Sequence, residues 1–403
     1  MADGTAGRAT AGGKPADGTA GRATADAGPG AGHLGFVTWD RTGPSGGNTY
    51  NRELVAALRA GGTGVVVHAL PGSWPDPAGP DLDRLAEALA AHPVCLVDGI
   101  VASGAPGPVA EAVAAGHRVV VLVHMATADE VGLPPAVAAR REEAEGRALR
   151  AASTVVATSS TAAQDLAARH GLTDVRVARP GVRRAAPARG SAPPRILAVA
   201  NLTPTKDPLT LVRALAEVQD LAWTAVLVGS HDVDPDYAGT VRRAADALGD
   251  RVRFAGALMG DALEEQWAAA DLLVLTSRTE TFGMVVLEAL AHGVPAVVGA
   301  GTGAVEALTR GAPDGGAGEP SGVVVPAPGI PGTAVPTGDP HTLARVLRRW
   351  LTDPALRSTW RRTAQDRRAR LPGWDVTAAI VGQLLDDQRR PGQVSLRRAR
   401  PRG

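Results

Sequence analysis

The chain has 403 residues, 44% of them hydrophobic and 21% charged, and its 42 Lys plus Arg against 41 Asp plus Glu leave a net charge of +1. This is the composition of an ordinary globular protein, and it excludes a general electrostatic attraction to nucleic acid or anionic membranes. The single cysteine, Cys95, excludes an intramolecular disulfide and a cysteine-based zinc cluster, and it favours a reducing compartment such as the cytoplasm. No apolar run reaches the roughly 18 residues that a membrane-spanning helix needs.

Both ends of the chain are predicted to be disordered. The segment ADGTAGRATA at residues 2–11 recurs at 16–25 and carries no large apolar side chain. Such a leader, taken as 1–32, cannot bury enough surface to offset the entropy of ordering it, and it lacks the apolar stretch of a signal peptide. The arginine-rich tail at 391–403 has the same character.

From Leu34 onward, short apolar runs alternate with helical stretches. The runs are rich in Val, Ile and Leu without strict polar alternation, which is typical of parallel strands buried on both faces. The first series is Leu34–Trp39, Gly64–Leu70, Val94–Ile100, Arg118–Met125, Thr154–Thr158 and Val175–Ala178. The second is Arg195–Leu202, Thr224–Gly229, Val252–Ala257, Asp271–Thr276, Pro295–Val298 and Gly322–Val325. Alternating strands and helices predict two doubly wound α/β sheets.

The Pro- and Arg-rich run Arg179–Pro194 separates the two series and is the predicted interdomain linker. We therefore expect one Rossmann-like domain over 33–185 and a second over 195–371. A last helix within 372–390 is expected to pack back on the first domain. Ligands of such sheets bind at the carboxyl ends of the strands, which predicts a cleft between the two domains.

The segment Thr276–Gly293, TSRTETFGMVVLEALAHG, carries the most chemistry. A strand ends near its start, a loop follows, and a helix begins near Met284. A helix N-terminus offers unpaired N–H groups and a positive dipole end, both of which suit phosphate. Gly283 would let a phosphate or a sugar approach the backbone closely.

Two glutamates lie on either side of the Phe282–Gly283 pair in this segment. Glu288 stands about one turn into an otherwise apolar helix, where a carboxylate is costly to bury unless it has a partner. Ribose hydroxyls beside a diphosphate would be suitable partners. Glu280 precedes the helix and could reach a sugar beyond the phosphates. As single residues, the two would be ordinary helix and N-terminal acids.

This pattern resembles the signature of family 4 retaining glycosyltransferases, in which two glutamates bracket a Phe-Gly pair. The resemblance covers most of 34–385 and implies the GT-B fold, with two Rossmann-like domains facing each other across a cleft. It also takes in Thr203–Pro208 (TPTKDP), Gly301–Glu306, Gly322–Pro326 followed by Gly338–Asp339, and Trp374–Asp375.

The resemblance also implies roles for individual residues of the second domain, which would bind the donor. Glu288 would hold the ribose of a nucleotide-diphosphate sugar, and Glu280 would hold hydroxyls of the transferred sugar. The backbone at Phe282, Gly283, Met284 and Val285 would receive sugar and phosphate oxygens. The first domain would bind the acceptor.

Lys206 follows the strand Arg195–Leu202, where a cation can neutralise the charge that builds on a departing diphosphate. Alone it would be an ordinary exposed lysine. Family members usually carry an arginine five positions earlier, but this chain has Asn201, which can donate a hydrogen bond and supplies no charge. Arg278 is a candidate for the missing charge.

In the first domain, the segment Pro44–Asn48 (PSGGN) is predicted to be a loop before a helix that starts near Tyr50 or Asn51. Its Gly46–Gly47 pair could bring N–H groups to a phosphate or an acceptor, although a plain tight turn would look the same. His124, expected at the end of the strand Arg118–Met125, would contact the donor sugar by resemblance.

The predicted reaction is therefore the retaining transfer of a hexosyl unit, without a metal or other cofactor. The nucleotide-diphosphate sugar is the co-substrate, and GDP-mannose, UDP-glucose and UDP-N-acetylglucosamine remain open as donors. The acceptor and the linkage are open, and contact with a membrane surface is open for a lipid acceptor. The alternatives are a nucleotide-sugar epimerase or hydrolase of the same fold and a non-catalytic nucleotide-sugar-binding protein. A dinucleotide-dependent dehydrogenase is disfavoured because no GxGxxG opens the first unit.

Overall fold

The computed structural model describes residues 33–41, 45–130, 132–311 and 329–389. The predicted disordered ends, 1–32 and 391–403, lie outside these residues. So does the predicted strand Gly322–Val325.

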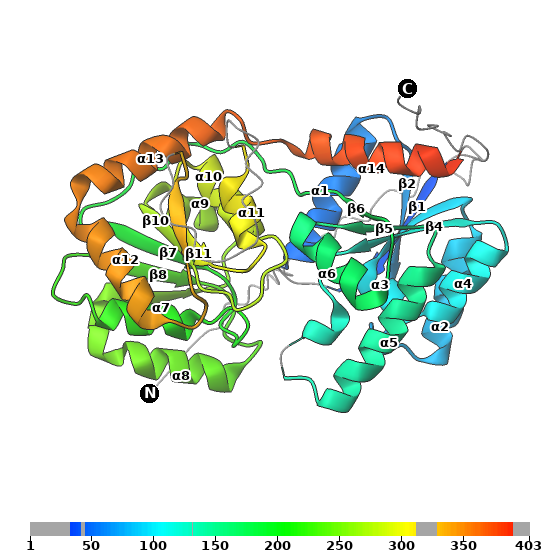
Figure 1. Ribbon diagram of the computed structural model, residues 1–403, viewed down its shortest axis with the longest axis horizontal. Helices are drawn as coiled ribbons and strands as arrows, with labels where there is room; N and C mark the ends of the chain where they lie inside the picture. Colours follow the sequence, from blue (N-terminus) through cyan, green and yellow to red (C-terminus); the bar gives the residue numbers. More distant parts are fainter. Residues whose placement is uncertain (1–32, 42–44, 131, 312–328, 390–403) are drawn as a thin grey trace, which may run out of the picture. The chain divides into compact units, whose positions relative to one another are not determined.

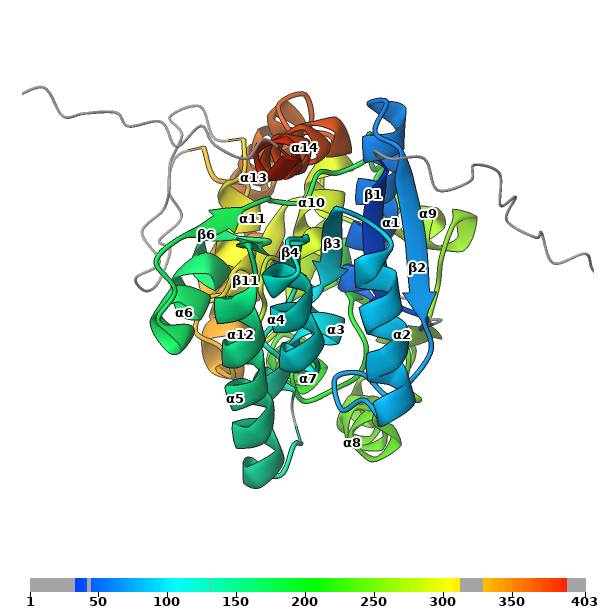
Figure 2. The same cartoon turned by 90° about the vertical axis from the view of Figure 1, so that its right-hand side faces the viewer.

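The first half of the chain forms a sheet of six parallel strands in the order β2-β1-β3-β4-β5-β6. The strands are β1 (Leu34–Trp39), β2 (Val65–Leu70), β3 (Val94–Asp98), β4 (Arg118–Val123), β5 (Thr154–Ala157) and β6 (Val175–Val177). The helices between them are α1 (Gly46–Ala60), α2 (Gly79–Ala90), α3 (Gly99–Ser103), α4 (Pro106–Ala114), the 3-10 turn η1 (Thr127–Asp129), α5 (Pro135–Ala151) and α6 (Ser160–His170). Figure 2 looks at this half, with α2, α4 and α5 in front of the sheet.

The second half forms another six-stranded parallel sheet in the order β12-β11-β10-β7-β8-β9. Its strands are β7 (Arg195–Val199), β8 (Thr224–Val228), β9 (Val252–Gly256), β10 (Leu272–Leu275), β11 (Ala296–Gly299) and β12 (Gly332–Val335). Its helices are α7 (Pro208–Ala216), α8 (Pro235–Ala245), the 3-10 turn η2 (Asp246–Arg251), α9 (Asp261–Ala268), α10 (Met284–Ala291), α11 (Ala304–Thr309), α12 (Pro340–Thr352) and α13 (Pro354–Arg368). The predicted pair of doubly wound sheets is confirmed (Figure 1).

Both faces of each sheet are buried, which is why the strands read as continuous apolar runs. In β4, Val119, Val121 and Val123 pack into one hydrophobic cluster of the first half, whereas Val120 and Leu122 pack into the other. Successive side chains of a strand point to opposite faces, so an unbroken Val/Leu run fills two cores at once.

The sixth strand of the second sheet is β12, at a place where no strand was predicted. The two segments GVVVP at 322–326 and GTAVP at 332–336 are similar strings, and both contain a glycine, small or branched residues and a proline. A Cβ on Gly332 would come within 1.8 Å of the carbonyl oxygen of Ala296 in the neighbouring β11. The pairing of β12 with β11 therefore needs a glycine at the first residue of β12.

The chain crosses between the two halves twice. The first crossing is the predicted linker, which contains neither helix nor strand over 180–194. The second leads into α14 (Trp374–Arg389), which packs against α1 of the first half (Figure 1). The two crossings touch where the N–H of Val182 donates to the carbonyl of Pro372 at 3.1 Å. The exact domain boundaries stay a prediction.

Candidate functional site

A cleft of about 790 Å³ opens at the carboxyl ends of the strands of both sheets. In each sheet it lies at the point where the strand order reverses, between β1 and β3 and between β7 and β10, as expected for doubly wound sheets. Except for the candidate cation Arg278, all the site residues predicted from the sequence line this one cleft. They are Gly46, Gly47, His124, Asn201, Lys206, Glu280, Phe282, Gly283, Met284, Val285 and Glu288.

The loops after β7 and β10 are tied to each other at the floor of the cleft. The hydroxyl of Thr276 donates to the carbonyl of Asp207 at 2.8 Å, and the N–H of Arg278 donates to the carbonyl of Thr205 at 2.8 Å. The buried carboxylate of Asp207 caps α7 and accepts from the hydroxyl of Tyr237 at 3.1 Å. These bonds fix the backbone that carries Lys206.

Lys206 and Glu280, one from each of these loops, form an ion pair. Nζ of Lys206 lies 2.7 Å from Oε2 of Glu280, which also accepts from the hydroxyl of Ser277 at 3.3 Å. Arg278, the candidate for a second cation, is engaged elsewhere. Its guanidinium is 60% exposed and pairs with Asp207 at 3.0 Å, and it is absent from the cleft lining. Lys206 is thus the cation that this end of the cleft presents in the described part of the chain.

The N-terminus of α10 opens onto the cleft. Gly283 stands before its first residue with φ of 81°, a left-handed conformation that suits glycine, and no side chain of the described segments caps the helix. A Cβ at Gly283 would lie 3.1 Å from Cβ of Ala304. The side chain of Phe282 is buried in the core, so only its backbone is available to a ligand. The first N–H groups of α10 are therefore presented without competition from a side-chain cap.

Glu288 is half-buried in α10 and lines the cleft. Among the described residues, no side chain forms a hydrogen bond or an ion pair with its carboxylate. Burial, and secondarily the charge of Glu264, raises the pKa of Glu288 to about 7. Its carboxylate is thus the kind of group that gains from hydroxyl donors.

Asn201 follows β7 by two residues and also lines the cleft. Its carboxamide oxygen accepts from the N–H of Ser230 at 3.0 Å and thereby ties the loop after β7 to the loop after β8. Its amide group is the part left to meet a ligand.

The predicted loop Pro44–Asn48 is wrong, because α1 already begins at Gly46. The hydroxyl of Ser45 accepts from the N–H of Asn48 at 3.1 Å and caps the helix. Glycine is a poor helix former, so two glycines in the first turn make this helix start hard to predict from the sequence. Gly46 and Gly47 therefore lie in the first turn of a helix that points its N-terminus into the cleft. Pro44 lies outside the described residues.

His124 directly follows β4, which ends at Val123, two residues earlier than predicted. Its Nε2 lies 2.8 Å from Oδ1 of Asn51, and Nδ2 of Asn51 lies 2.6 Å from Oδ2 of Asp98. The ring also meets the edge of Tyr50 at 5.0 Å between centroids. Burial lowers the pKa of His124, and the charge of Asp98 opposes that shift, so the neutral imidazole is favoured at neutral pH.

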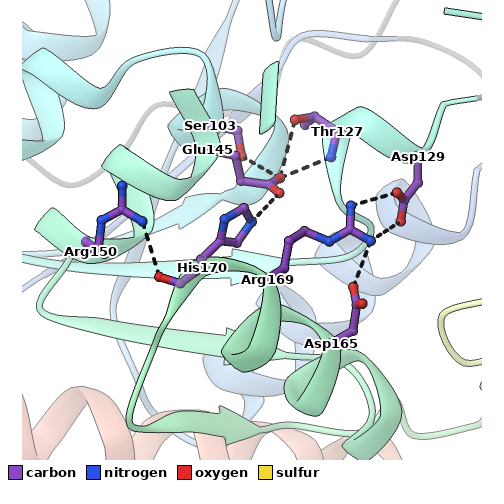
Figure 3. A network of polar contacts seen from close by, with 8 residues as sticks. All are labelled: Ser103, Thr127, Asp129, Glu145, Arg150, Asp165, Arg169 and His170. Atoms are coloured by element: carbon purple, nitrogen blue, oxygen red, sulfur yellow. Dashed lines mark hydrogen bonds and ion pairs between the residues drawn. The ribbon is translucent and has the colours of Figure 1, made fainter. Parts of the chain in front are cut away.

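A buried glutamate of α5, Glu145, fixes the loop that follows His124 through a hydrogen bond to Thr127 (Figure 3). Its carboxylate accepts from the N–H of Thr127 at 3.0 Å and from the hydroxyl of Ser103 at 3.1 Å, and it meets Nε2 of His170 at 2.9 Å. Glu145 is fully buried. This network fixes the turn η1, whose neighbours line the first-half side of the cleft.

Sequence reasoning missed Asn51, Asp98 and Glu145. Asp98 is the last residue of β3, and a polar residue at the end of an apolar run was the available signal. Asn51 and Glu145 lie inside helices, where polar residues are common, and nothing local distinguishes them.

Residues 183–367 match the family model of glycosyl transferases group 1. The match covers somewhat less than half of the chain, and over these residues the chain is similar to that family. The resemblance drawn from Glu280 and Glu288 is thereby confirmed, since both lie within the match.

Two curated relatives are D-inositol 3-phosphate glycosyltransferases. The one from Kineococcus radiotolerans is 32% identical over 58% of this chain and 57% of its own length. The one from Salinispora tropica is 35% identical over 60% of this chain and 52% of its own length. The aligned part of the chain thus spans little more than half of each relative.

Solved structures share the fold over most of the chain. Sucrose-phosphate synthase of Thermosynechococcus elongatus superposes with a TM-score of 0.69 over 88% of this chain and 98% of that one, at 22% identity. HepE of Anabaena in complex with UDP-glucose gives 0.68 over 88% and 100%, at 18% identity. These likenesses establish the GT-B fold. None of the helices in the described ranges is long and apolar enough to cross a membrane.

Proposed function

We propose that this protein is a retaining glycosyltransferase that moves a hexosyl unit from a nucleotide-diphosphate sugar to an acceptor. The observation that supports this most is the grouping at one end of the cleft. Lys206, the N-terminus of α10 and the carboxylate of Glu288, which pairs with no described side chain, lie together there. Cation and helix N-terminus suit a diphosphate, and the carboxylate suits a ribose diol.

In the proposed reaction, the bond between the anomeric carbon and the diphosphate oxygen breaks, and a bond from the acceptor oxygen to the same carbon forms on the same face. The acceptor proton passes to the leaving diphosphate. Lys206 and the N–H groups at Met284 and Val285 stabilise the charge that grows on that diphosphate. Glu280 and His124 orient the sugar, which is a positioning role. The reaction needs no metal in this scheme, because the diphosphate is neutralised by the protein's own groups.

Two donors and one acceptor deserve the first trials. UDP-glucose is the ligand of one solved neighbour, and the curated relatives are named for D-inositol 3-phosphate. Arg41 lies on the first-half side of the cleft, stacked 5.0 Å from the ring of Trp39, and no carboxylate among the described residues pairs with it. An exposed cation there supports a phosphorylated acceptor. GDP-mannose is the second donor to try.

We place the reaction in the cytoplasm, in keeping with the buried thiol of Cys95.

The test begins with thermal shifts of the full chain against GDP, UDP, ADP and dTDP, with and without chelator. A ligand at about 100 times its Kd adds roughly 2.7 kcal/mol to stability. We expect one diphosphate to raise the Tm with or without chelator, and Glu288→Ala to lose that response. Transfer from the matching sugar donor to D-inositol 3-phosphate and to inositol is then measured.

The outcomes separate the alternatives. Stabilisation by no diphosphate contradicts the proposal as a whole. Donor consumption without any acceptor points to an epimerase or a hydrolase. Binding without turnover in the presence of many acceptors points to a non-catalytic nucleotide-sugar-binding protein.

A further inference from the structure

We infer that Asp98 and Asn51 are positioning residues that decide which nitrogen of His124 carries its proton. They place that proton on Nε2, which leaves Nδ1 to accept a hydrogen bond from a hydroxyl of the bound sugar. The inferred contact with the sugar rests on the proposed function. The inferred position of the proton rests on the geometry of three side chains alone.

The direction of the chain of hydrogen bonds is set at Asp98. This carboxylate is 6% exposed and can only accept. Its Oδ1 accepts from the N–H of Ile100 at 3.2 Å, a donor that cannot reverse because it belongs to the backbone. Its Oδ2 accepts from the hydroxyl of Thr38 at 3.3 Å and meets Asn51 at 2.6 Å.

The direction set at Asp98 fixes the orientation of the Asn51 carboxamide. It is 5% exposed, and since it faces a carboxylate, the group that it turns toward Asp98 is its NH₂. Its carboxamide oxygen then faces His124, at 2.8 Å from Nε2. An amide oxygen carries no hydrogen, so the ring nitrogen must be the donor. His124 is therefore the Nε2–H tautomer when neutral.

The other ring nitrogen is left for a ligand. The Cδ2 edge of the ring lies against α1, where a Cβ on Gly47 would be 3.3 Å from Cδ2. Nδ1 is on the opposite edge, and no described residue bonds to it. His124 lines the cleft. A neutral imidazole with its proton on Nε2 presents a lone pair at Nδ1, which is the acceptor that a sugar hydroxyl needs.

One nearly isosteric substitution, Asp98→Asn, should reverse the donor–acceptor direction of every hydrogen bond between Asp98 and His124. In Asp98→Asn, the N–H of Ile100 still requires an oxygen at the place of Oδ1, so the new NH₂ takes the place of Oδ2. It then donates to Asn51, which turns its oxygen toward it and its NH₂ toward His124. Nε2 of His124 must now accept, and the proton moves to Nδ1. A wrong histidine tautomer is known to disable an otherwise intact site.

The measurement is ¹⁵N NMR of the full chain labelled at histidine, with the signals of His124 identified by their loss in His124→Gln. We expect Nε2–H in the wild type and Nδ1–H in Asp98→Asn. Thr38→Val is the matched control, because it also removes a hydrogen bond to Asp98 but leaves the direction of the chain unchanged, so Nε2–H should persist. Nδ1–H in the wild type, or an unchanged tautomer in Asp98→Asn, overturns the inference.

Enzyme assays on the same variants test the inferred hydrogen bond between Nδ1 of His124 and the sugar. Asp98→Asn should lower turnover about tenfold or more, which is the loss of one hydrogen bond to a buried partner. It should leave the Kd of the free nucleoside diphosphate unchanged, because that ligand has no sugar hydroxyl to offer. Unchanged turnover despite an inverted tautomer overturns the sugar contact. Failure of the wild type to bind any diphosphate contradicts the proposed function instead and leaves the NMR result standing.

Discussion

At the scale of single residues, the cleft combines groups that are satisfied with groups that are not. Lys206 is held by Glu280, and His124 is held by Asn51. Glu288 has no side-chain partner in the part of the chain that the structure describes. A bound nucleotide sugar would have to offer this carboxylate hydroxyl donors and take part of the charge of Lys206 from Glu280.

Replacing Lys206 by Ala should slow transfer. The lysine is the cation next to the proposed leaving group, so its loss should lower kcat by on the order of 10²-fold or more, comparable to removal of one stabilising donor from a transition state. The Kd of the intact donor should change less than kcat. Steady-state kinetics and donor titrations on both proteins measure this. An unchanged turnover number would refute the role.

Glu288 predicts a pH dependence. Its pKa in the folded protein is raised to about 7, above its ordinary value of 4.5. The stability contributed by its protonated form is complete below pH 4.5 and is lost as the pH rises through 7. Glu288→Gln should therefore be more stable than the wild type at pH 8, by on the order of 1–3 kcal/mol, and equally stable at pH 4.5.

Urea denaturation of the free protein at the two pH values checks this. Glu265→Gln, an exposed glutamate of α9, is the control and should show no pH-dependent gain. A Glu288→Gln variant that is less stable than the wild type at pH 8 would show that the carboxylate has a stabilising partner in the free protein.

At the scale of elements, the sequence predicted most strands and helices because parallel buried strands leave long Val and Leu runs. It missed the strand β12 and the early start of α1. The four residues of β12, in GTAVP, form a string similar to GVVVP at 322–326, so the sequence did not single them out. In α1, the two glycines of the first turn argue against a helix locally, while Ser45 caps it. The hydrogen bonds from Asp98 through Asn51 to His124 join residues at the end of β3, in α1 and after β4, so no local pattern contains them.

The two ends of α10 offer a matched experiment. Gly283 before the helix and Gly293 after it both have positive φ, 81° and 71°. Ala at either position should destabilise the fold by about 1–2 kcal/mol. Only Gly283→Ala should also weaken diphosphate binding, because only that end faces the cleft.

Urea denaturation gives the two stabilities, and calorimetric titration with the diphosphate gives the two affinities. Equal losses of affinity at both ends would mean that the helix contributes only through its stability.

At the scale of the whole molecule, the second half also contacts the first through Glu306 of α11. Its Oε2 accepts from the N–H of Ser160 at the start of α6, at 2.9 Å, and its Oε1 pairs with Arg179 at the beginning of the linker. Arg179 in turn bonds to the hydroxyl of Ser160. This cluster joins the two halves at one side of the cleft.

Glu306→Gln should loosen that junction. The charged acceptor of Ser160 and Arg179 is lost, which should cost about 1–3 kcal/mol. We expect a lower Tm and a higher KM for the acceptor, because the proposed transfer needs an acceptor on the first half to lie beside the donor on the second. Glu87→Gln, on the surface of α2, is the control. Unchanged values in Glu306→Gln would show that the cluster does not hold the halves.

The contact between Val182 and Pro372 has a mechanical consequence. Two segments of chain pass between the halves side by side, so the line along them is the expected hinge axis. Sliding or twisting of one half against the other would stretch both segments, whereas swinging about their common line would stretch neither. We expect the cleft to open and shut by rotation about that line, with the largest travel at the edge farthest from it and the smallest beside the linker.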